Sequence, residues 1–105
     1  MPFSPLIGAA ALQDRLGDPT LVILDASWYL ANTARDAHAE FLECHLPGAQ
    51  FFDIDLTSDH SSPLPHMLPP VSEFEATARA LGISAHDAVV VYDGSGVNLS
   101  AARVW

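Results

Sequence analysis

The chain has 105 residues, half of them hydrophobic, with 13 acidic and four basic residues and a net charge of −9. A chain of this length and hydrophobic content forms one domain with one core and is not intrinsically disordered. The negative charge argues against nucleic acid or an anionic membrane as a partner, although acidity can also serve solubility alone.

A short helix and a buried strand open the chain. Residues 9–16 place apolar side chains on one helical face, and the helix is expected to end near Gly17. The continuous apolar run 21–24 predicts a strand that is buried on both faces of a parallel sheet. This strand stops at Asp25, and residues 26–34 follow as a loop.

A helix, a sharp turn and a short strand come next. Residues 35–44 predict a helix whose apolar face includes Cys44, which we therefore expect to be a small buried side chain with a structural role. Pro47 cannot continue a helix, and Gly48 can adopt the left-handed dihedral angles that close a turn. A short buried strand is expected over residues 49–52.

Residues 53–70 are the longest irregular segment and hold four prolines. Long loops in compact domains are usually functional or disordered, and prolines stiffen a loop, so we expect an ordered lid or wall of a site. A capping box formed by Ser72 and Glu75 predicts a helix that runs to about Leu81, with Phe74 turned inward.

The last elements define the fold class. Residues 88–92 form the clearest strand, residues 93–98 a loop, and residues 99–105 the start of another helix. Strands that alternate with helices predict an α/β fold with a mainly parallel sheet flanked by helices. Ligands of such sheets bind beyond the carboxyl ends of the strands, so chemistry is expected in the loops after strands 21–24, 49–52 and 88–92.

The sequence lacks the usual signs of export or membrane insertion. No apolar run approaches the ~20 residues that span a bilayer, and the N-terminus has no basic region of a signal peptide. The one cysteine, Cys44, cannot form an internal disulfide. A cytoplasmic, reducing location fits best.

A long motif surrounds the Pro-Gly turn. It reads Phe41-x-x-x-His45-Leu46-Pro47-Gly48-Ala49-x-x-Phe52, and agreement continues through Asp53-Ile54-Asp55, Ser61-Ser62-Pro63-Leu64-Pro65-His66 and Ser100-Ala101-Ala102-Arg103. In these residues the chain resembles rhodanese-type sulfurtransferases over most of its length. The 3-mercaptopyruvate subgroup is the most similar, followed by the thiosulfate subgroup. The resemblance implies a rhodanese-like domain that is truncated at its C-terminus.

Members of this family carry two such domains in tandem, and the second holds a catalytic cysteine. Its thiolate takes sulfur from a small-molecule donor, becomes a persulfide and passes the sulfur to a thiol or cyanide acceptor. The resemblance implies that residues 1–105 are an incomplete N-terminal domain. This domain forms a non-catalytic wall of the site beside a C-terminal rhodanese domain, and no cofactor is implied.

Asp93 stands where the nucleophile of an active rhodanese domain would fall, directly after the strand at residues 88–92. The chemistry needs a cysteine of low pKa among backbone N–H groups that stabilise the thiolate. A carboxylate cannot carry sulfur. We therefore expect no catalytic residue in this chain and no sulfur transfer by the chain alone.

Three further residues match positions that the 3-mercaptopyruvate subgroup uses. Asp55 and His66 match a pair that assists proton movement there, and a carboxylate that orients an imidazole gives a base near neutral pH. The alternative is that His66 only caps the proline-rich loop. Trp28 matches a substrate-side aromatic residue of the family, or else packs between domains.

Other polar residues are expected to be structural. His45 is predicted to form a hydrogen bond to the turn rather than to act in catalysis. Arg103 is predicted to pair with a buried carboxylate, Asp25 or Asp53, because a lone buried guanidinium is costly. The histidines, Cys44 and the aspartates match no tight ligand spacing, so no metal site is expected.

Other functions stay open beside the sulfurtransferase. One is a standalone, non-catalytic rhodanese-like binding or regulatory module, because the chain holds no nucleophile. A protein phosphatase on the same fold would need a Cys-x5-Arg loop after the strand, which this sequence lacks. An incomplete domain also predicts exposed apolar surface over residues 97–105, which self-association could cover.

Overall fold

The computed structural model describes residues 4–95 and 99–105. Its strands form one parallel sheet in the order β2-β1-β3. Strand β1 spans Leu21–Asp25, β2 spans Gln50–Phe51 and β3 spans Ala88–Tyr92. This arrangement confirms the predicted α/β fold with a mainly parallel sheet.

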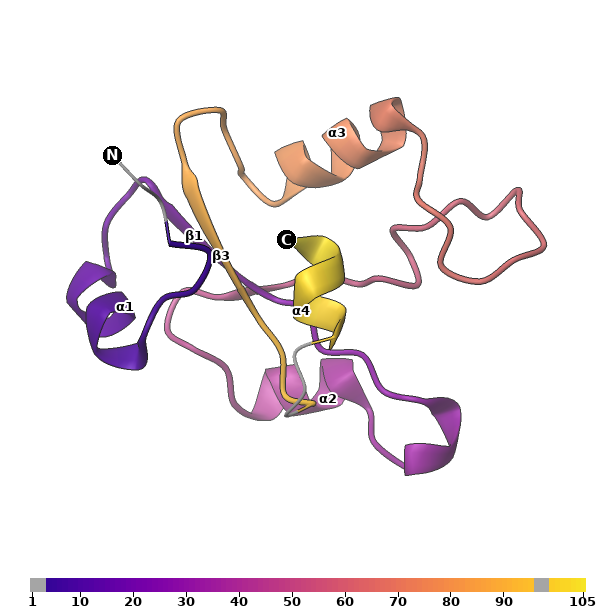
Figure 1. The fold of residues 1–105 in the computed structure, drawn as a ribbon, viewed down its shortest axis with the longest axis horizontal. Helices are drawn as coiled ribbons and strands as arrows, with labels where there is room; N and C mark the ends of the chain where they lie inside the picture. Colours follow the sequence, from indigo (N-terminus) through magenta and orange to yellow (C-terminus); the bar gives the residue numbers. More distant parts are fainter. Residues whose placement is uncertain (1–3, 96–98) are drawn as a thin grey trace.

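Helices flank the sheet on several sides (Figure 1). The helices of the described residues are α1 (Ala9–Arg15), the 3₁₀ helix η1 (Ala31–Thr33), α2 (Ala37–Glu43), α3 (Val71–Ala80) and α4 (Leu99–Val104). Helix α1 and the proline-rich loop lie at opposite ends of the long axis in Figure 1, and α4 packs against β3. In this part of the chain, no helix is long and apolar enough to cross a bilayer.

Three loops leave the sheet at one edge. Since the strands are parallel, the residues after Asp25, Phe51 and Tyr92 all emerge at the carboxyl ends. The backbone continues the pairing just past the strands, because Ala26 N–H donates to Tyr92 O (2.9 Å) and Phe52 N–H donates to Asp25 O (2.8 Å). The starts of these loops are therefore fixed by the sheet.

The core lies beneath the same edge. Leu24, Ala26, Phe52 and Ile54 are buried together, with Ala26 fully inaccessible. Partly buried apolar side chains pack around them, namely Val22, Trp28, Leu81, Ile83, Val91 and Val104. The four buried side chains of this cluster thus lie in or just past the carboxyl ends of β1 and β2.

Helix α3 begins differently from its prediction. Val71 is its first residue, Pro70 is the residue before it, and Ser72 already lies in the first turn, so the predicted capping box is wrong. The Pro70 carbonyl accepts from the N–H groups of Glu73 (3.1 Å) and Phe74 (3.0 Å), which starts the helix earlier than a Ser72 cap would. Phe74 is 45% exposed, so the inward orientation expected for it is also wrong.

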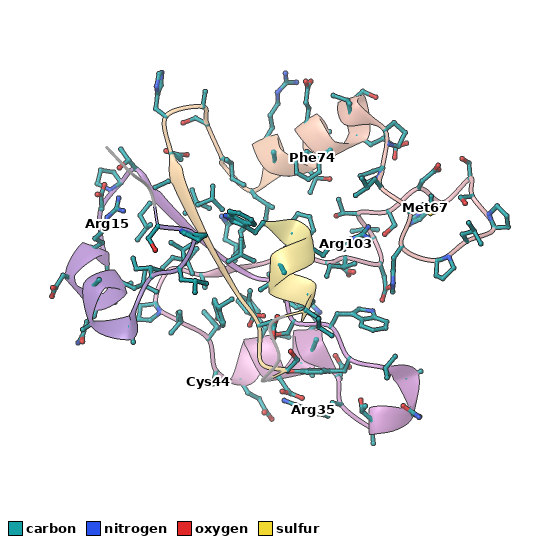
Figure 2. The ribbon with its side chains drawn as sticks, viewed as in Figure 1. Arg15, Arg35, Cys44, Met67, Phe74 and Arg103 are labelled. Carbon is teal, nitrogen blue, oxygen red and sulfur yellow. The ribbon has the colours of Figure 1, made fainter. Side chains whose placement is uncertain are left out.

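Helix α2 is shorter than predicted and ends before Cys44. It runs from Ala37 to Glu43, with the Asp36 carboxylate accepting from Ala39 N–H (3.0 Å) at its start. Cys44 takes an extended backbone (φ −157°, ψ 126°) and is exposed. The prediction of a buried Cys44 is wrong because this residue leaves helical geometry and no longer shares the apolar face. Figure 2 shows it at the end of α2.

The loop over residues 53–70 has no helix or strand but is held by hydrogen bonds. Ser58 Oγ donates to Ile54 O (2.5 Å), and Asp59 N–H donates to Met67 O (2.8 Å). This agrees with the expectation of an ordered segment. Residues 96–98 of the predicted loop after β3 lie outside the described residues.

Candidate functional site

A cavity of about 300 Å³ lies where the loops after β1 and β2 meet. The lining includes aromatic, acidic and basic side chains, among them Trp28, Tyr29, Arg35, Asp53 and Asp55. Its position at the carboxyl edge of the sheet agrees with the expectation from strand polarity.

Trp28, Asp55 and His66 meet beside this cavity. Asp55 Oδ1 lies 2.6 Å from His66 Nε2 and accepts from Trp28 Nε1 at 3.2 Å, while Oδ2 accepts from Trp28 Nε1 at 3.1 Å. The Trp28 and His66 rings pack edge to face, with centroids 4.8 Å apart. The fold thus joins three residues chosen from the sequence, and their part in catalysis stays a prediction.

The loop after β1 holds Trp28 in place. Ser27, the preceding residue, is buried, and its backbone N–H (2.9 Å) and Oγ (2.6 Å) both donate to Asp25 Oδ1. This Asx-type turn fixes the chain as it leaves the strand. The indole therefore projects from a rigid base.

Asp55 and His66 are placed by the loop that follows β2. Asp55 comes directly after buried Ile54, and His60 Nε2 lies 2.8 Å from the Asp55 carbonyl oxygen. His66 has a left-handed backbone, with φ +57°. Such dihedral angles are uncommon for a non-glycine residue and cluster at functional sites. Here that turn accompanies the contact of the imidazole with Asp55.

Asp93 follows β3 and forms hydrogen bonds within its own loop. Its Oδ1 accepts from Ser95 N–H (2.9 Å) and Ser95 Oγ (2.5 Å), and its Oδ2 accepts from Ala101 N–H (2.8 Å) in the first turn of α4. Burial acts to raise the pKa of Asp93, but the hydrogen bonds from Ser95 and Ala101 outweigh it and lower the pKa below its ordinary value. The carboxylate is therefore ionised at neutral pH.

Gly94 ties this loop to the loop after β1. Its N–H donates to Ser27 Oγ (2.9 Å), and a Cβ at this position would lie 2.6 Å from Tyr29 Oη. Only glycine fits this contact without a shift of the tyrosine. The two loops consequently pack as one unit.

Arg35 holds Tyr29 against that unit. Its guanidinium lies 3.9 Å from the centre of the Tyr29 ring, its Nη2 donates to Tyr29 Oη (3.0 Å), and it pairs with Glu40 (2.7 Å). The hydrogen bond from Arg35 lowers the pKa of the Glu40 carboxyl. No motif in the sequence predicted this cluster, because its one signal was a rare basic residue in an acidic chain.

His45 contacts the end of α2 rather than the Pro-Gly turn to which a hydrogen bond was predicted, and its structural role stays a prediction. Its Nδ1 lies 2.7 Å from the Phe41 carbonyl oxygen, and its ring stacks on the Phe41 ring with centroids 4.1 Å apart. The imidazole thus closes the end of α2 just before the Pro-Gly turn.

Arg103 is exposed on α4, so its predicted burial beside Asp25 or Asp53 is wrong. Asp25 accepts from Ser27 instead, and Asp53 accepts from a backbone N–H of its own loop. The reason is geometric, because α4 turns Ala101 toward the core and leaves Arg103 outside. Figure 2 shows Arg103 on the short helix at the front of the sheet.

Cys44 is not part of the loop after β3. It directly follows α2 and is exposed. Partial burial raises the pKa of Tyr92, and the negative charge of Asp25 acts in the same direction. Among residues 4–95 and 99–105, no three His, Cys, Asp or Glu side chains gather in a way that could hold a metal ion.

Comparisons with known proteins agree on one family. A family model described as a rhodanese-like domain matches residues 8–105. The 3-mercaptopyruvate sulfurtransferase of Rattus norvegicus is 54% identical over 98 residues, which cover 92% of this chain and 33% of that protein. The mitochondrial thiosulfate/3-mercaptopyruvate sulfurtransferase 1 of Arabidopsis thaliana is 48% identical over 101 residues, which cover 96% of this chain and 26% of that protein.

A solved structure shows the same architecture. The crystal structure of SseA from Escherichia coli, described as having the rhodanese fold of 3-mercaptopyruvate sulfotransferases, matches with a TM-score of 0.86 at 41% identity. The match covers 94% of this chain and 38% of that chain. The present chain therefore spans about a third of the length of the curated relatives it matches.

Proposed function

The chain belongs to the rhodanese-like domain family, and we propose that it forms the N-terminal, non-catalytic domain of a sulfurtransferase. In this proposal the full protein moves a sulfur atom from 3-mercaptopyruvate or thiosulfate to a thiol or cyanide acceptor. A C-terminal rhodanese domain supplies the sulfur-carrying cysteine, and residues 1–105 supply one wall of the site. The names of the relatives and their greater length support this division.

The proposal depends mainly on the loop after β3, where an aspartate occupies the position of the nucleophile and the nearby N–H groups already form hydrogen bonds. A sulfur carrier needs a thiolate surrounded by free backbone N–H donors. In the described part of this loop, Asp93 stands in place of a thiol. The Gly94 N–H is bonded to Ser27, and the N–H groups of Ser95 and Ala101 are bonded to Asp93 itself. This loop therefore supports the site without carrying sulfur.

Asp55 and His66 are proposed to assist a proton transfer on a group from the C-terminal domain. The Asp55 contact is on His66 Nε2 at 2.6 Å, and within the described part of the chain Nδ1 has no hydrogen-bond partner. A neutral imidazole that donates through Nε2 keeps its Nδ1 lone pair open, which suits it to accept a proton. Trp28 belongs to the same wall.

The test is sulfur transfer by the full-length gene product. We expect release of sulfur from 3-mercaptopyruvate, thiosulfate or both when a thiol or cyanide is present. A properly folded full-length protein that releases sulfur from neither donor would remove the proposal. A cytoplasmic location is part of the same proposal and is tested by cell fractionation.

The isolated 105-residue chain is expected to transfer no sulfur. Its single thiol, Cys44, lies at the end of α2 and outside the loop after β3. Turnover by the isolated chain that Cys44→Ser abolishes would show that the nucleophile was assigned wrongly.

The second candidate is a standalone rhodanese-like binding or regulatory module. It is favoured by the cavity of about 300 Å³, which residues of this chain form without a thiol in its lining. The reading frame beyond Trp105 separates the two candidates. A second domain with a Cys-Gly loop favours the enzyme, and a stop codon favours the module.

A further inference from the structure

We propose that Trp28 is a positioning residue, whose indole N–H fixes the Asp55 carboxylate and, through it, the His66 imidazole. The inference rests on the proposed function, because it gives Trp28 a task in the proton transfer assigned to Asp55 and His66. It differs from the family-based expectation, in which Trp28 faces the substrate or packs between domains.

The indole nitrogen of Trp28 lies within hydrogen-bond distance of both Asp55 carboxylate oxygens. Trp28 Nε1 lies 3.2 Å from Asp55 Oδ1 and 3.1 Å from Oδ2, so one N–H is shared almost equally by both carboxylate oxygens. His66 Nε2 approaches Oδ1 at 2.6 Å. The Asp55 side chain is 66% exposed, so little packing holds its orientation. The two donors therefore determine where the carboxylate points.

The same indole contacts both Asp55 and His66. Its ring meets the His66 ring edge to face, at 4.8 Å between centroids and 87° between planes. Edge-to-face packing is a preferred arrangement of aromatic rings and restricts rotation of the imidazole. Trp28 thus restrains the carboxylate by a hydrogen bond and the imidazole by ring contact.

The backbone next to Trp28 is held by hydrogen bonds, and the Trp28 side chain has one hydrogen-bond donor. Its neighbour Ser27 is buried and bonded to Asp25, so the backbone that carries the indole is fixed. The indole N–H is the single polar group of a tryptophan side chain. Since Asp55 accepts it, a donated hydrogen bond from Trp28 to a substrate would break the contact that orients the pair.

The consequence concerns the protonation pattern of His66. A fixed Asp55 holds the proton of a neutral imidazole on Nε2 and leaves Nδ1 as the open lone pair. Without the indole N–H, Asp55 can rotate toward solvent and both neutral tautomers become populated. The fraction of protein ready for proton transfer then falls, while substrate binding is unaffected.

The experiment uses Trp28→Phe in the full-length protein, because phenylalanine keeps an aromatic ring and removes the N–H. We expect kcat with 3-mercaptopyruvate to fall about tenfold, as for loss of one hydrogen bond to a charged group, with KM within about twofold of wild type. Nitrogen-15 shifts of labelled histidine should report an Nε2–H tautomer in the wild type and a mixture in the variant.

Trp105→Phe is the matched control. Trp105 follows α4, its backbone N–H donates to Ala101 O, and no contact in the described part of the chain joins it to Asp55 or His66, so the same substitution removes an indole N–H outside that pair. We expect its kcat, KM and histidine tautomers to equal those of the wild type.

Two results would overturn the inference. One is a raised KM with kcat retained, which would make Trp28 a substrate-binding residue. The other is unchanged kinetics and tautomers in Trp28→Phe. If this variant fails to fold, Asp55→Asn is used in its place. The inference then requires that the NMR resonance of the Trp28 indole N–H shifts in Asp55→Asn relative to the wild type, while the Trp105 indole resonance does not shift. If the wild-type protein has no sulfurtransferase activity, the proposed function is wrong. The histidine and indole resonances still test whether Trp28 holds Asp55 and His66 in place.

Discussion

In the described part of the chain, Asp93 accepts hydrogen bonds from Ser95 in its own loop and from Ala101 in α4, and the latter bond connects the end of β3 to the start of α4. These bonds favour the ionised carboxylate and keep its pKa below the ordinary value, against the opposing effect of burial. A group whose pKa is lower in the folded state stabilises the fold above its unfolded pKa. That stabilisation is lost as the pH falls through the folded pKa.

The first prediction at this scale is that Asp93→Asn lowers the free energy of unfolding at neutral pH by about 1–2 kcal/mol, because a charged acceptor is lost. The deficit should shrink as the pH falls below about 4, where the carboxyl of the unfolded chain becomes protonated, and should be lost once the pH also falls below the lower pKa of the folded state. Urea unfolding at a series of pH values measures it. Asp14→Asn, an equal charge change on exposed α1, is the control. A deficit that is independent of pH would contradict this account of Asp93.

A second prediction concerns the contact between Gly94 and Tyr29. Gly94→Ala should lower the free energy of unfolding by about 1–2 kcal/mol, because its Cβ would lie 2.6 Å from Tyr29 Oη. Adding Tyr29→Phe removes that hydroxyl and should recover part of the loss. Gly8→Ala is the control, since its Cβ would meet nothing within 4 Å. Equal effects of Gly94→Ala and Gly8→Ala would show that the two loops do not pack as described.

Side-chain orientations were the least predictable feature at the scale of residues. Trp28, Asp55 and His66 could be chosen from a family motif, and the fold brings them into contact. Cys44 and Arg103 were assigned to the wrong environment, because the burial of a side chain near a helix end depends on where the helix stops and which face docks. Helical spacing alone does not fix either property.

At the scale of elements, strands were easier to predict than helix ends. The apolar runs at β1 and β3 indicate strands that are buried in a parallel sheet. Predicting such strands requires no knowledge of which side chains lie beside them. Two groups could accept hydrogen bonds from the first N–H groups of α3, namely the Pro70 carbonyl and the Ser72 side chain. The Pro70 carbonyl accepts them, so the helix begins at Val71. Alternative helix starts of this kind differ little in free energy, so sequence rules predict poorly which of them forms.

The turn before β2 yields the prediction for this scale. Gly48 has φ +77°, and a Cβ there would meet nothing within 4 Å, so the cost of Gly48→Ala is conformational rather than steric crowding by neighbours. We expect a loss of about 1–2 kcal/mol in the free energy of unfolding. Gly8→Ala, at φ −77°, should change little by comparison. Thermal or urea unfolding of both variants measures the difference, and a Gly48→Ala protein as stable as Gly8→Ala would contradict the left-handed turn.

At the scale of the molecule, apolar side chains remain exposed around α3 and α4. Leu68 (73% exposed), Val71 (75%), Leu99 (75%) and Trp105 (78%) are the most accessible of them. Figure 2 shows Phe74 on α3 above Arg103 on α4, and both side chains line a small second cavity. Exposed apolar patches mark surfaces that bind other protein surfaces.

We therefore predict that the isolated chain self-associates as its concentration rises, and light scattering measures this. Leu99→Glu should shift the equilibrium toward monomer, because it places a charge among these side chains. Leu42→Glu, at a site 67% exposed on α2, is the control and should leave the association unchanged. A clean monomer at high concentration would contradict the prediction.

The overall topology followed from the sequence, whereas the shape of the site did not. Alternating helices and strands predicted a parallel α/β sheet, and strand polarity predicted the edge at which loops gather. The cavity and the Arg35–Glu40 pair beside it depend on how separate loops pack in three dimensions. No local pattern in the chain encodes that packing.

The most direct test of the central claim asks which cysteine carries sulfur. The full-length protein is incubated with 3-mercaptopyruvate, its persulfides are trapped with an alkylating reagent, and the modified peptide is identified by mass spectrometry. We predict a persulfide on a cysteine outside residues 1–105 and none on Cys44. A persulfide on Cys44 would contradict the claim that this domain shapes the site without carrying the sulfur.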